Sequence, residues 1–235
     1  MPARGNTAGA DQGQRRSSLT QARSIATKQA LVTSAMALWR SNGYANTTVA
    51  DICKAAGVSK PLFYFYFPRK EDALFEAGLL STRDAYAKAH ELLSRPYELP
   101  SLITEVLRAL EQTMRRNPPE LIIEAVLEGY RQDQPANTDG RAPDVFSTLL
   151  VEVFERAVAD GKLAPDFDTE HVAHVAQTLV GEGARHWAAG KYGTKSFAEV
   201  VGRDIAAVIA GFNEAGQGEW TIKAPRRNPR SNIRK

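Results

Sequence analysis

Several features that would place a protein in a specialised class are scarce in this sequence. It has one cysteine, Cys53, so no internal disulfide can form, which is typical of proteins from a reducing cytoplasm. No apolar run approaches the roughly 20 residues that a membrane span needs, and residues 1–20 lack the apolar segment of a secretory signal. Cys-x-x-Cys pairs, glycine-rich phosphate loops and nucleophile elbows are also absent. We therefore expect a cytoplasmic protein that has no cofactor, no membrane partner and no enzymatic activity.

The formal net charge of +3 hides an uneven distribution of charge along the 235 residues. Residues 1–75 carry 10 Lys and Arg against 4 Asp and Glu, whereas residues 76–219 carry 14 against 23. Residues 220–235 add 6 basic residues and no acidic one. A basic front end on an acidic body suggests that the front contacts a polyanion, although basic ends are also common in solvated tails.

Periodic apolar residues predict helices along most of the chain, and no alternating strand pattern is present. The expected fold class is all-α, with about nine helices. The predicted helices cover residues 22–41, 49–56, 60–67, 70–95, 100–116, 118–131, 143–160, 169–189 and 196–215. Residues 1–21 and 218–235 are expected to be a disordered basic leader and tail. Arg15, Arg16 and Arg23 would alternatively make the leader a basic arm that reaches the minor groove of DNA.

The front of the chain, residues 22–69, has the pattern of a helix-turn-helix domain. Thr48 and Asp51 form a capping-box pattern at the start of the second helix. Gly57 supplies a tight turn after that helix, and Ser59 is expected to cap the third helix. Three short helices within about 45 residues, with a glycine turn between the second and the third, are typical of a DNA-reading domain.

Helical spacing divides the third helix into an inner and an outer face. Phe63 and Phe67 lie one turn apart, so with Val58 they are expected to pack onto Ile52 and Trp39. The remaining aromatic side chains then face outward, and packing of the core does not account for them. A tyrosine suits a surface that DNA covers, because its ring can contact thymine methyl groups and its hydroxyl can bind a phosphate.

Two helix starts beside the third helix are candidate phosphate anchors. Thr47 and Thr48 stand at the start of the second helix, where free N–H groups favour an anion, and Lys70 stands at the start of the fourth. The complete set of candidate DNA contacts is Thr47, Thr48, Ser59, Lys60, Pro61, Tyr64, Phe65, Tyr66 and Lys70. Tyr66 is expected at the flank of the outer face.

These segments resemble the DNA-binding domain of the tetracycline-repressor-type (TetR) transcriptional regulators. The resemblance lies in GY at 43–44, TTVADI at 47–52, AGVS at 56–59 and FYFYFPRKEDAL at 63–74. It implies that Lys60, Pro61 and Tyr64 contact bases. It also implies that Thr48, Tyr66 and Lys70 contact phosphates. Pro61 and Leu62 stand where many members have glycine and a small hydroxyl residue, so the resemblance implies no base preference.

Residues 70–217 form the acidic body, for which the resemblance implies effector binding and dimerisation. The stretch 121–130 is apolar on nearly all sides, which predicts a buried helix. A bundle of this kind can enclose an apolar cavity, and a solid core is the alternative. Candidate pocket residues are Leu102, Val106, Leu110, Met114, Ile123, Leu127, Tyr130, Phe146, Leu150 and Phe154. Candidate dimer contacts are Val172, Val175, Leu179, Trp187, Ile205, Val208, Ile209 and Phe212.

The function expected from these features is that of a dimeric, sequence-specific repressor. It would leave a palindromic DNA operator when a small, mostly apolar effector binds. One alternative is a DNA-binding regulator without a ligand, and activation is as compatible with the sequence as repression. A metal-dependent enzyme is a further alternative, because His171 and His174 lie three residues apart. A solvated histidine pair explains the same spacing, and Cys53 is expected to be a small buried apolar side chain.

Overall fold

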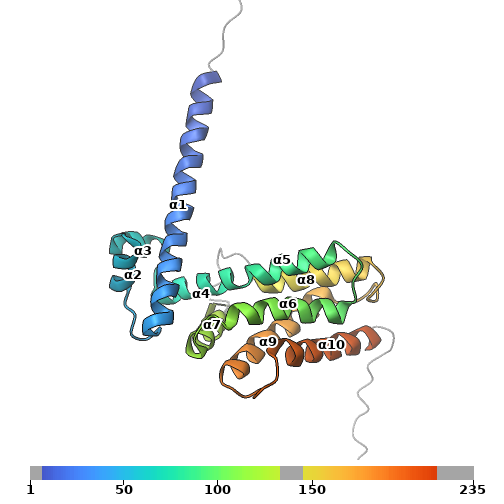
Figure 1. Cartoon of the computed structure of the whole chain (residues 1–235). Coiled ribbons are helices and arrows are strands. Elements are labelled where there is room, and N and C mark those ends of the chain that lie inside the picture. The colour runs from blue at the N-terminus through green and yellow to red at the C-terminus, as the bar shows by residue number, and fades with distance from the viewer. Residues whose placement is uncertain (1–6, 133–144, 216–235) are drawn as a thin grey trace, which may run out of the picture.

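The computed structural model describes residues 7–132 and 145–215, and this part of the chain contains ten helices and no strands (Figure 1). The helices are α1 (Thr7–Asn42), α2 (Val49–Ala56), α3 (Lys60–Tyr66), α4 (Lys70–Ser81), α5 (Arg83–Leu93), α6 (Leu99–Met114), α7 (Pro119–Gln132), α8 (Val145–Ala159), α9 (Thr169–Ala188) and α10 (Phe197–Ala215). The all-α prediction is confirmed. Across the described ranges, no helix combines the length and the apolarity that crossing a bilayer would require.

Two hydrophobic cores divide the molecule into a head and a body, and α4 joins them (Figure 1). The head core contains buried side chains of α1, α2 and α3, together with Ala73, Leu74 and Ala77 of α4 and Leu121 of α7. The body core is built from α5 to α10. The head core therefore extends past residue 69 to Ala77 of α4.

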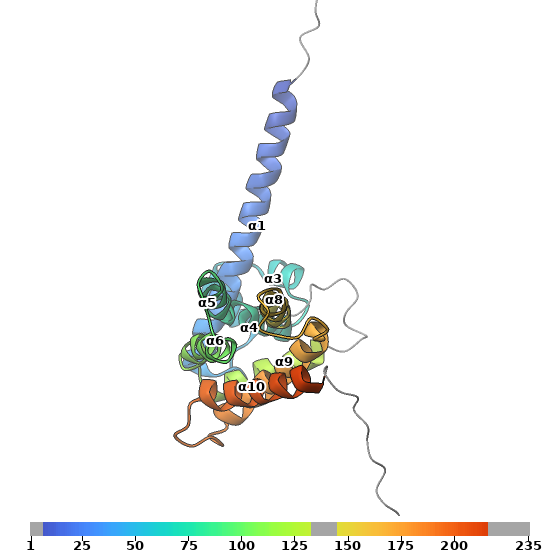
Figure 2. The same ribbon diagram turned by 90° about the vertical axis from the view of Figure 1, so that its right-hand side faces the viewer.

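The body is a helical bundle in which α6 occupies a central position. Helix α6 packs against α5 and α10, while α9 packs against α7, α8 and α10. Figure 2 looks nearly along α5, α6 and α8, and α10 crosses below them. Helix α5 also contacts α8, and an apolar seam lies between α6 and α8.

The predicted helix 70–95 is divided in two at Thr82, so the prediction of one continuous helix is wrong. The Ser81 hydroxyl donates to the carbonyl of Ala77 over 2.9 Å, and the Thr82 hydroxyl donates to the carbonyl of Leu79 over 2.7 Å. Side chains that bond to the backbone in this way compete with the helical ladder and bend a helix. Head and body thus meet through two short helices with one residue between them.

Helix α1 begins at Thr7, although composition predicts no regular structure up to residue 21. No proline lies between Pro2 and Pro61, and this stretch is rich in Ala, Gln and Arg, which favour helices. Composition typical of a solvated leader is therefore also compatible with a helix. Figure 1 shows this part of α1 projecting away from α2 and α3. Residues 1–6 and 216–235, which hold the rest of the predicted leader and the tail, lie outside the described part.

Candidate nucleic-acid interface

Helix α2 begins at the capping box that its sequence predicts. The Thr48 hydroxyl accepts a hydrogen bond from the Asp51 N–H over 3.2 Å, and the Asp51 carboxylate accepts one from the Thr48 N–H over 2.9 Å. The carboxylate also accepts a 2.6 Å bond from the Thr48 hydroxyl. These bonds lower the pKa of the Asp51 carboxyl below its usual range. They hold the start of α2 rigid, with Thr48 exposed at its tip.

The turn into α3 depends on Gly57, which adopts a left-handed conformation with a φ of 67°. Glycine reaches this region without steric cost, and the next N–H, of Val58, bonds to the Cys53 carbonyl over 3.0 Å. Ser59 occupies the N-cap position of α3, but its hydroxyl makes no capping bond, so this part of the prediction is wrong. The backbone geometry alone starts the helix there.

Packing of α3 into the head core agrees with the predicted inner face. Phe63, Trp39 and Ile52 are completely buried, and Phe67 is nearly so. The Phe63 and Phe67 rings lie 5.6 Å apart, which is an ordinary spacing for packed aromatic rings. Because these side chains fill the core, the opposite face of α3 is fixed in orientation.

The outer face of α3 carries large apolar side chains in water. Phe65 is 77% exposed, Tyr64 is 50% exposed and Leu62 is 36% exposed, and Lys60 and Pro61 are exposed beside them. The structure therefore brings the predicted base-facing residues together on one surface. We call Lys60, Pro61, Leu62, Tyr64 and Phe65 the reading face.

Tyr66 lies at the flank of the reading face, as its position on the helix predicts. It is half-buried, and its hydroxyl oxygen lies 3.0 Å from the hydroxyl oxygen of Ser24 on α1. Its ring also packs edge-on against Phe65, with the ring centres 5.1 Å apart. Tyr66 thus holds α3 against α1 and presents only part of its surface to a phosphate.

Thr47 does not lie on this surface, although the sequence suggests a phosphate contact. Its side chain is buried, and its hydroxyl donates to the Gly43 carbonyl over 2.8 Å. This bond closes the turn that follows α1. A β-branched hydroxyl residue can satisfy a turn carbonyl as readily as an anion, so the residue type alone does not separate the two roles.

Lys70 is likewise turned toward the protein. Its Nζ donates to the carbonyls of Tyr44 and Thr47 over 3.0 and 3.1 Å and lies 4.1 Å from the centre of the Tyr44 ring. The lysine thus fastens the start of α4 to the loop before α2. The loop that it fastens ends at exposed Thr48, and the predicted phosphate contact of Lys70 stays a prediction.

A charged cluster with buried carboxylates and a half-exposed arginine joins the head to α7, and sequence reasoning missed it. Arg69, between α3 and α4, donates to the carboxylates of Asp72 and Glu128 over 2.9 and 3.0 Å. Gln132 donates to both carboxylates, and Glu128 is completely buried. Burial alone would raise the pKa of the Asp72 carboxyl, but hydrogen bonds from Arg69 and Gln132 lower it. We call Arg69, Asp72, Glu128 and Gln132 the α4–α7 junction.

Comparison with known proteins agrees with the geometry of the head. Residues 31–77 match the profile of the "Bacterial regulatory proteins, tetR family". The chain belongs to the TetR family of transcriptional regulators. Over 45 residues it is 44% identical to the transcriptional regulator EthR of Mycolicibacterium smegmatis, a match that spans 19% of this chain and only 21% of that regulator. TetR proteins are DNA-binding regulators and not enzymes.

Two longer matches extend this TetR relationship into the body. The chain is 22% identical over 192 residues to the transcriptional repressor KstR2 of M. smegmatis, covering 79% of this chain and 89% of the repressor. The crystal structure of the TetR-family repressor FadR of Thermus thermophilus, in complex with lauroyl-CoA, aligns with a TM-score of 0.66 at 24% identity. That alignment covers 84% of this chain and 98% of FadR, and it establishes a common fold.

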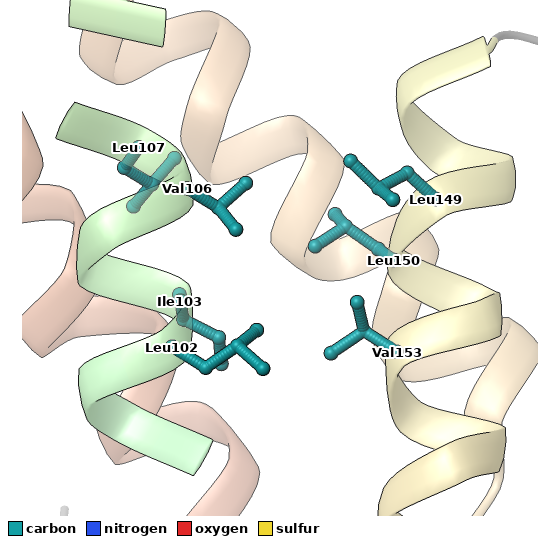
Figure 3. Close-up of a pocket in the computed structure, with 7 residues that line it drawn as sticks. All are labelled: Leu102, Ile103, Val106, Leu107, Leu149, Leu150 and Val153. Atoms are coloured by element: carbon teal, nitrogen blue, oxygen red, sulfur yellow. The ribbon is translucent and has the colours of Figure 1, made fainter. Parts of the chain in front are cut away.

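The body of this TetR regulator contains a narrow apolar seam between α6 and α8. Figure 3 shows side chains of the two helices facing each other across it. The lining side chains are Leu102, Ile103, Val106, Leu107, Leu149, Leu150 and Val153, and none is polar. The cavity has a volume of about 10 Å³, which is close to the minimum that one water molecule needs.

Only part of the predicted pocket lines this seam. Leu102, Val106 and Leu150 do so, whereas Leu110, Met114 and Phe154 are packed into the solid core. Ile123, Leu127 and Tyr130 lie on α7, where Ile123 is half-buried and the other two are 36% and 43% exposed. The prediction that α7 is buried on nearly all sides is therefore wrong. The Phe146 side chain lies outside the described residues.

The predicted dimer contacts also divide into two groups. Val172, Ile205 and Ile209 are buried inside the protomer and cannot meet a partner, because α9 and α10 turn these side chains inward. The remaining predicted contacts are partly accessible, and they are Val175, Leu179, Trp187, Val208 and Phe212.

His171 and His174 are two of the three histidines of α9. His171 and His174 are both exposed, and the His171 ring packs against the Phe212 ring at 5.5 Å. Among the residues whose positions are described, no group of three potential metal ligands occurs. Cys53 is buried in the head core, as its position predicts.

Proposed function

We propose that this protein is a dimeric repressor that binds a palindromic operator and leaves it when a small, mostly apolar effector enters the body. The observation that carries this proposal is the wholly apolar α6–α8 seam, because both of these helices pack against α5, which follows α4 in the chain. KstR2 is named a repressor, and the FadR structure is that of a repressor in complex with an acyl-CoA.

The reading face would enter the major groove of the operator. Lys60, Pro61, Tyr64 and Phe65 would meet base edges, while Thr48 at the tip of α2 would meet a phosphate. Ser59 and the accessible part of Tyr66 would contact the backbone beside them. Thr47 and Lys70 would act indirectly, since their bonds hold the loop that carries Thr48.

The accessible parts of α9 and α10 would form the dimer interface. One short helix reads too few base pairs for specificity, so two copies about 34 Å apart would read the two halves of a palindrome. Phe212 is the most accessible of the apolar candidates on these two helices, at 39%. A four-helix interface of this kind would place two heads on the same side of the dimer.

Substituting Phe212→Glu should therefore produce monomers. A carboxylate within an apolar interface loses its hydration and finds no partner there, so association becomes unfavourable. Sedimentation velocity would show a monomer at concentrations where the unmodified protein is a dimer. Leu127→Glu, on the accessible face of α7 at 36% exposure, is the matched control and should remain dimeric. A dimeric Phe212→Glu variant would place the interface elsewhere.

The route from the seam to the head runs through α5. Helix α5 packs against both α6 and α8, and only Thr82 separates it from α4. An effector larger than one water molecule would push α6 and α8 apart and displace α5. The displacement would tilt α4 and change the distance between the two reading faces of the dimer. A coupling of about 1–3 kcal/mol is typical of such transitions.

Operator binding with and without an apolar ligand tests this route. Lauroyl-CoA and dodecanoic acid are suitable probes, and a ligand that fits should raise the melting temperature and weaken operator binding about 5–150-fold. Replacing Val106 with Trp would fill the seam as a bound ligand does, so the variant should bind the operator weakly without any ligand and should no longer respond to one.

The narrowness of the seam supports a second candidate function. A cavity of about 10 Å³ is also what a solid core leaves, and a solid core would suit a regulator without a ligand. That function predicts an operator affinity that no apolar ligand changes and that Val106→Trp leaves unaltered.

A further inference from the structure

The reading face lacks the side chains that usually identify bases by hydrogen bonds. Helix α3, Lys60–Tyr66, contains no Arg, Asn, Gln, Asp or Glu. Asn and Gln pair with adenine, Asp and Glu accept from cytosine, and Arg is the commonest partner of guanine. Of the charged side chains, Lys60 alone remains on this helix. Direct hydrogen-bond recognition from α3 is thus limited to Lys60 and to the Tyr64 hydroxyl.

What the reading face offers instead is apolar surface at helical spacing. Pro61 and Phe65 lie one turn apart, and Leu62 lies three residues before Phe65, so the three side chains form a continuous strip. Packing against Tyr66 restrains the Phe65 ring, although 77% of that side chain remains in water. A restrained aromatic side chain loses little conformational entropy when a partner covers it.

We propose that the strip of Pro61, Leu62 and Phe65 identifies the operator through the 5-methyl groups of thymine. This inference rests on the proposed position of α3 in the major groove. Thymine is the only base that presents an apolar group there, so its methyl matches an apolar strip. The surroundings favour DNA as the occupant, because exposed Lys60 adjoins Pro61 in the chain and residues 1–75 carry a clear excess of positive charge.

The length of the strip limits the number of thymines that it contacts. Side chains one turn apart on a helix are separated by about 5–6 Å, and successive base pairs are separated by about 3.4 Å. The strip therefore covers two or three neighbouring base pairs in each half-site. A half-site should contain thymines at these positions, on either strand, and should tolerate change elsewhere more readily.

Base analogues that add or remove one methyl group test the inference directly. The operator is first selected from random duplexes with the full chain, and each thymine is then replaced by deoxyuridine. We expect a loss of affinity of about fourfold at two or three adjacent positions of each half-site, as for one buried methyl group. At the same positions, 5-methylcytosine should bind better than cytosine, because it restores the methyl group.

Protein variants connect the effect to the strip. In Phe65→Ala or Leu62→Ala, the penalty for deoxyuridine should disappear at the position that the lost side chain contacted. Leu127→Ala on α7 is the matched control, since Leu127 and Leu62 are both 36% exposed, and it should retain the full penalty.

The outcomes separate this inference from the function on which it rests. If selection yields no common sequence, the proposed sequence-specific reading by α3 is wrong, and the inference with it. If a specific operator emerges but deoxyuridine changes affinity by less than about twofold at every position, only the methyl inference is overturned. A penalty that persists unchanged in both strip variants also overturns it, because another part of the chain then contacts the methyl groups.

Discussion

Replacing Arg69 with alanine should destabilise the protein by about 3 kcal/mol and weaken operator binding. Arg69 donates to both Asp72 and Glu128, whose side chains are 7% and 0% exposed. Its removal leaves two carboxylates close together in the interior, where Gln132 donates to both and Arg131 pairs with Glu128. Because the α4–α7 junction fixes the start of α4, the head should also lose its orientation on the body. Chemical denaturation and operator titration measure the two effects.

The loss of stability should depend on pH in a defined direction. In the unmodified protein the pKa of Asp72 is lowered. Ionised Asp72 therefore stabilises the folded state at pH values above the unfolded-state pKa, and this stabilisation disappears as the pH falls. Without the Arg69 side chain the pKa of Asp72 should rise, because the guanidinium no longer lowers it, although the Gln132 amide and the backbone N–H of residue 69 still donate to the carboxylate. The difference in stability between the variant and the unmodified protein should therefore be largest at neutral pH and disappear as the pH falls below about 4, through the lowered pKa of Asp72.

A second buried carboxylate in the body supplies the control. Arg115 is 59% exposed and pairs with Glu111, which is nearly buried, much as Arg69 pairs with its carboxylates. Arg115→Ala should lose stability without a change in operator affinity, because Glu111 holds the start of α10 and not the head. Glu128→Gln should weaken operator binding while Arg69 keeps its charge. Equal effects of Arg115→Ala and Arg69→Ala on the operator would mean that the junction has no special role.

Tyr64→Ala should weaken binding to the operator far more than binding to random DNA. Tyr64 is half-exposed on the reading face, and its ring leans on Phe63 with the ring centres 5.5 Å apart. A specific base contact is worth about 1–3 kcal/mol, so we expect an operator loss of about tenfold or more. Affinity for random duplexes, which comes from phosphate contacts, should change by about twofold or less.

The conservative variant separates the ring of Tyr64 from its hydroxyl. Tyr64→Phe should retain most of the specificity if the ring supplies it, and should resemble Tyr64→Ala if the hydroxyl does. Titrations against both duplexes at several salt concentrations are sufficient. Equal losses on operator and random DNA in Tyr64→Ala would show that the side chain only anchors the protein.

Local sequence signals were sufficient for the framework of the head. Thr48 and Asp51 stand three residues apart before an apolar run, and this spacing is the sequence pattern of a capping box. Gly57 marks the turn because a left-handed residue is needed there. The inner positions of Phe63 and Phe67 follow from helical spacing alone.

Roles that depend on the three-dimensional setting could not be read from residue type. Thr47 and Lys70 both have side chains that can bind a phosphate, but in the structure both side chains donate hydrogen bonds to nearby turn carbonyls. The split at Thr82 was missed because the apolar period continues across it. The predicted pocket and dimer contacts failed in part because periodicity identifies an apolar face and does not say which neighbour covers it.

The sequence contains a signal for the α4–α7 junction, but a search for periodic apolar residues does not detect it. Glu128 and Gln132 continue the helical stripe begun by Leu121 and Ala125, so two polar residues stand where apolar ones would be expected. Polar residues at such positions need buried partners. The partner is Arg69, 59 residues earlier, and this distance in sequence is why the pairing was not apparent.

Chemical protection of the selected operator tests the central claim, which is that two copies of the α3 reading face lie in the major groove. Dimethyl sulfate modifies N7 of guanine in the major groove and N3 of adenine in the minor groove. We predict that the bound protein protects guanines in two patches whose centres are about 34 Å apart on one face of the duplex. Protection of minor-groove adenines alone, or of a single patch, would contradict the account.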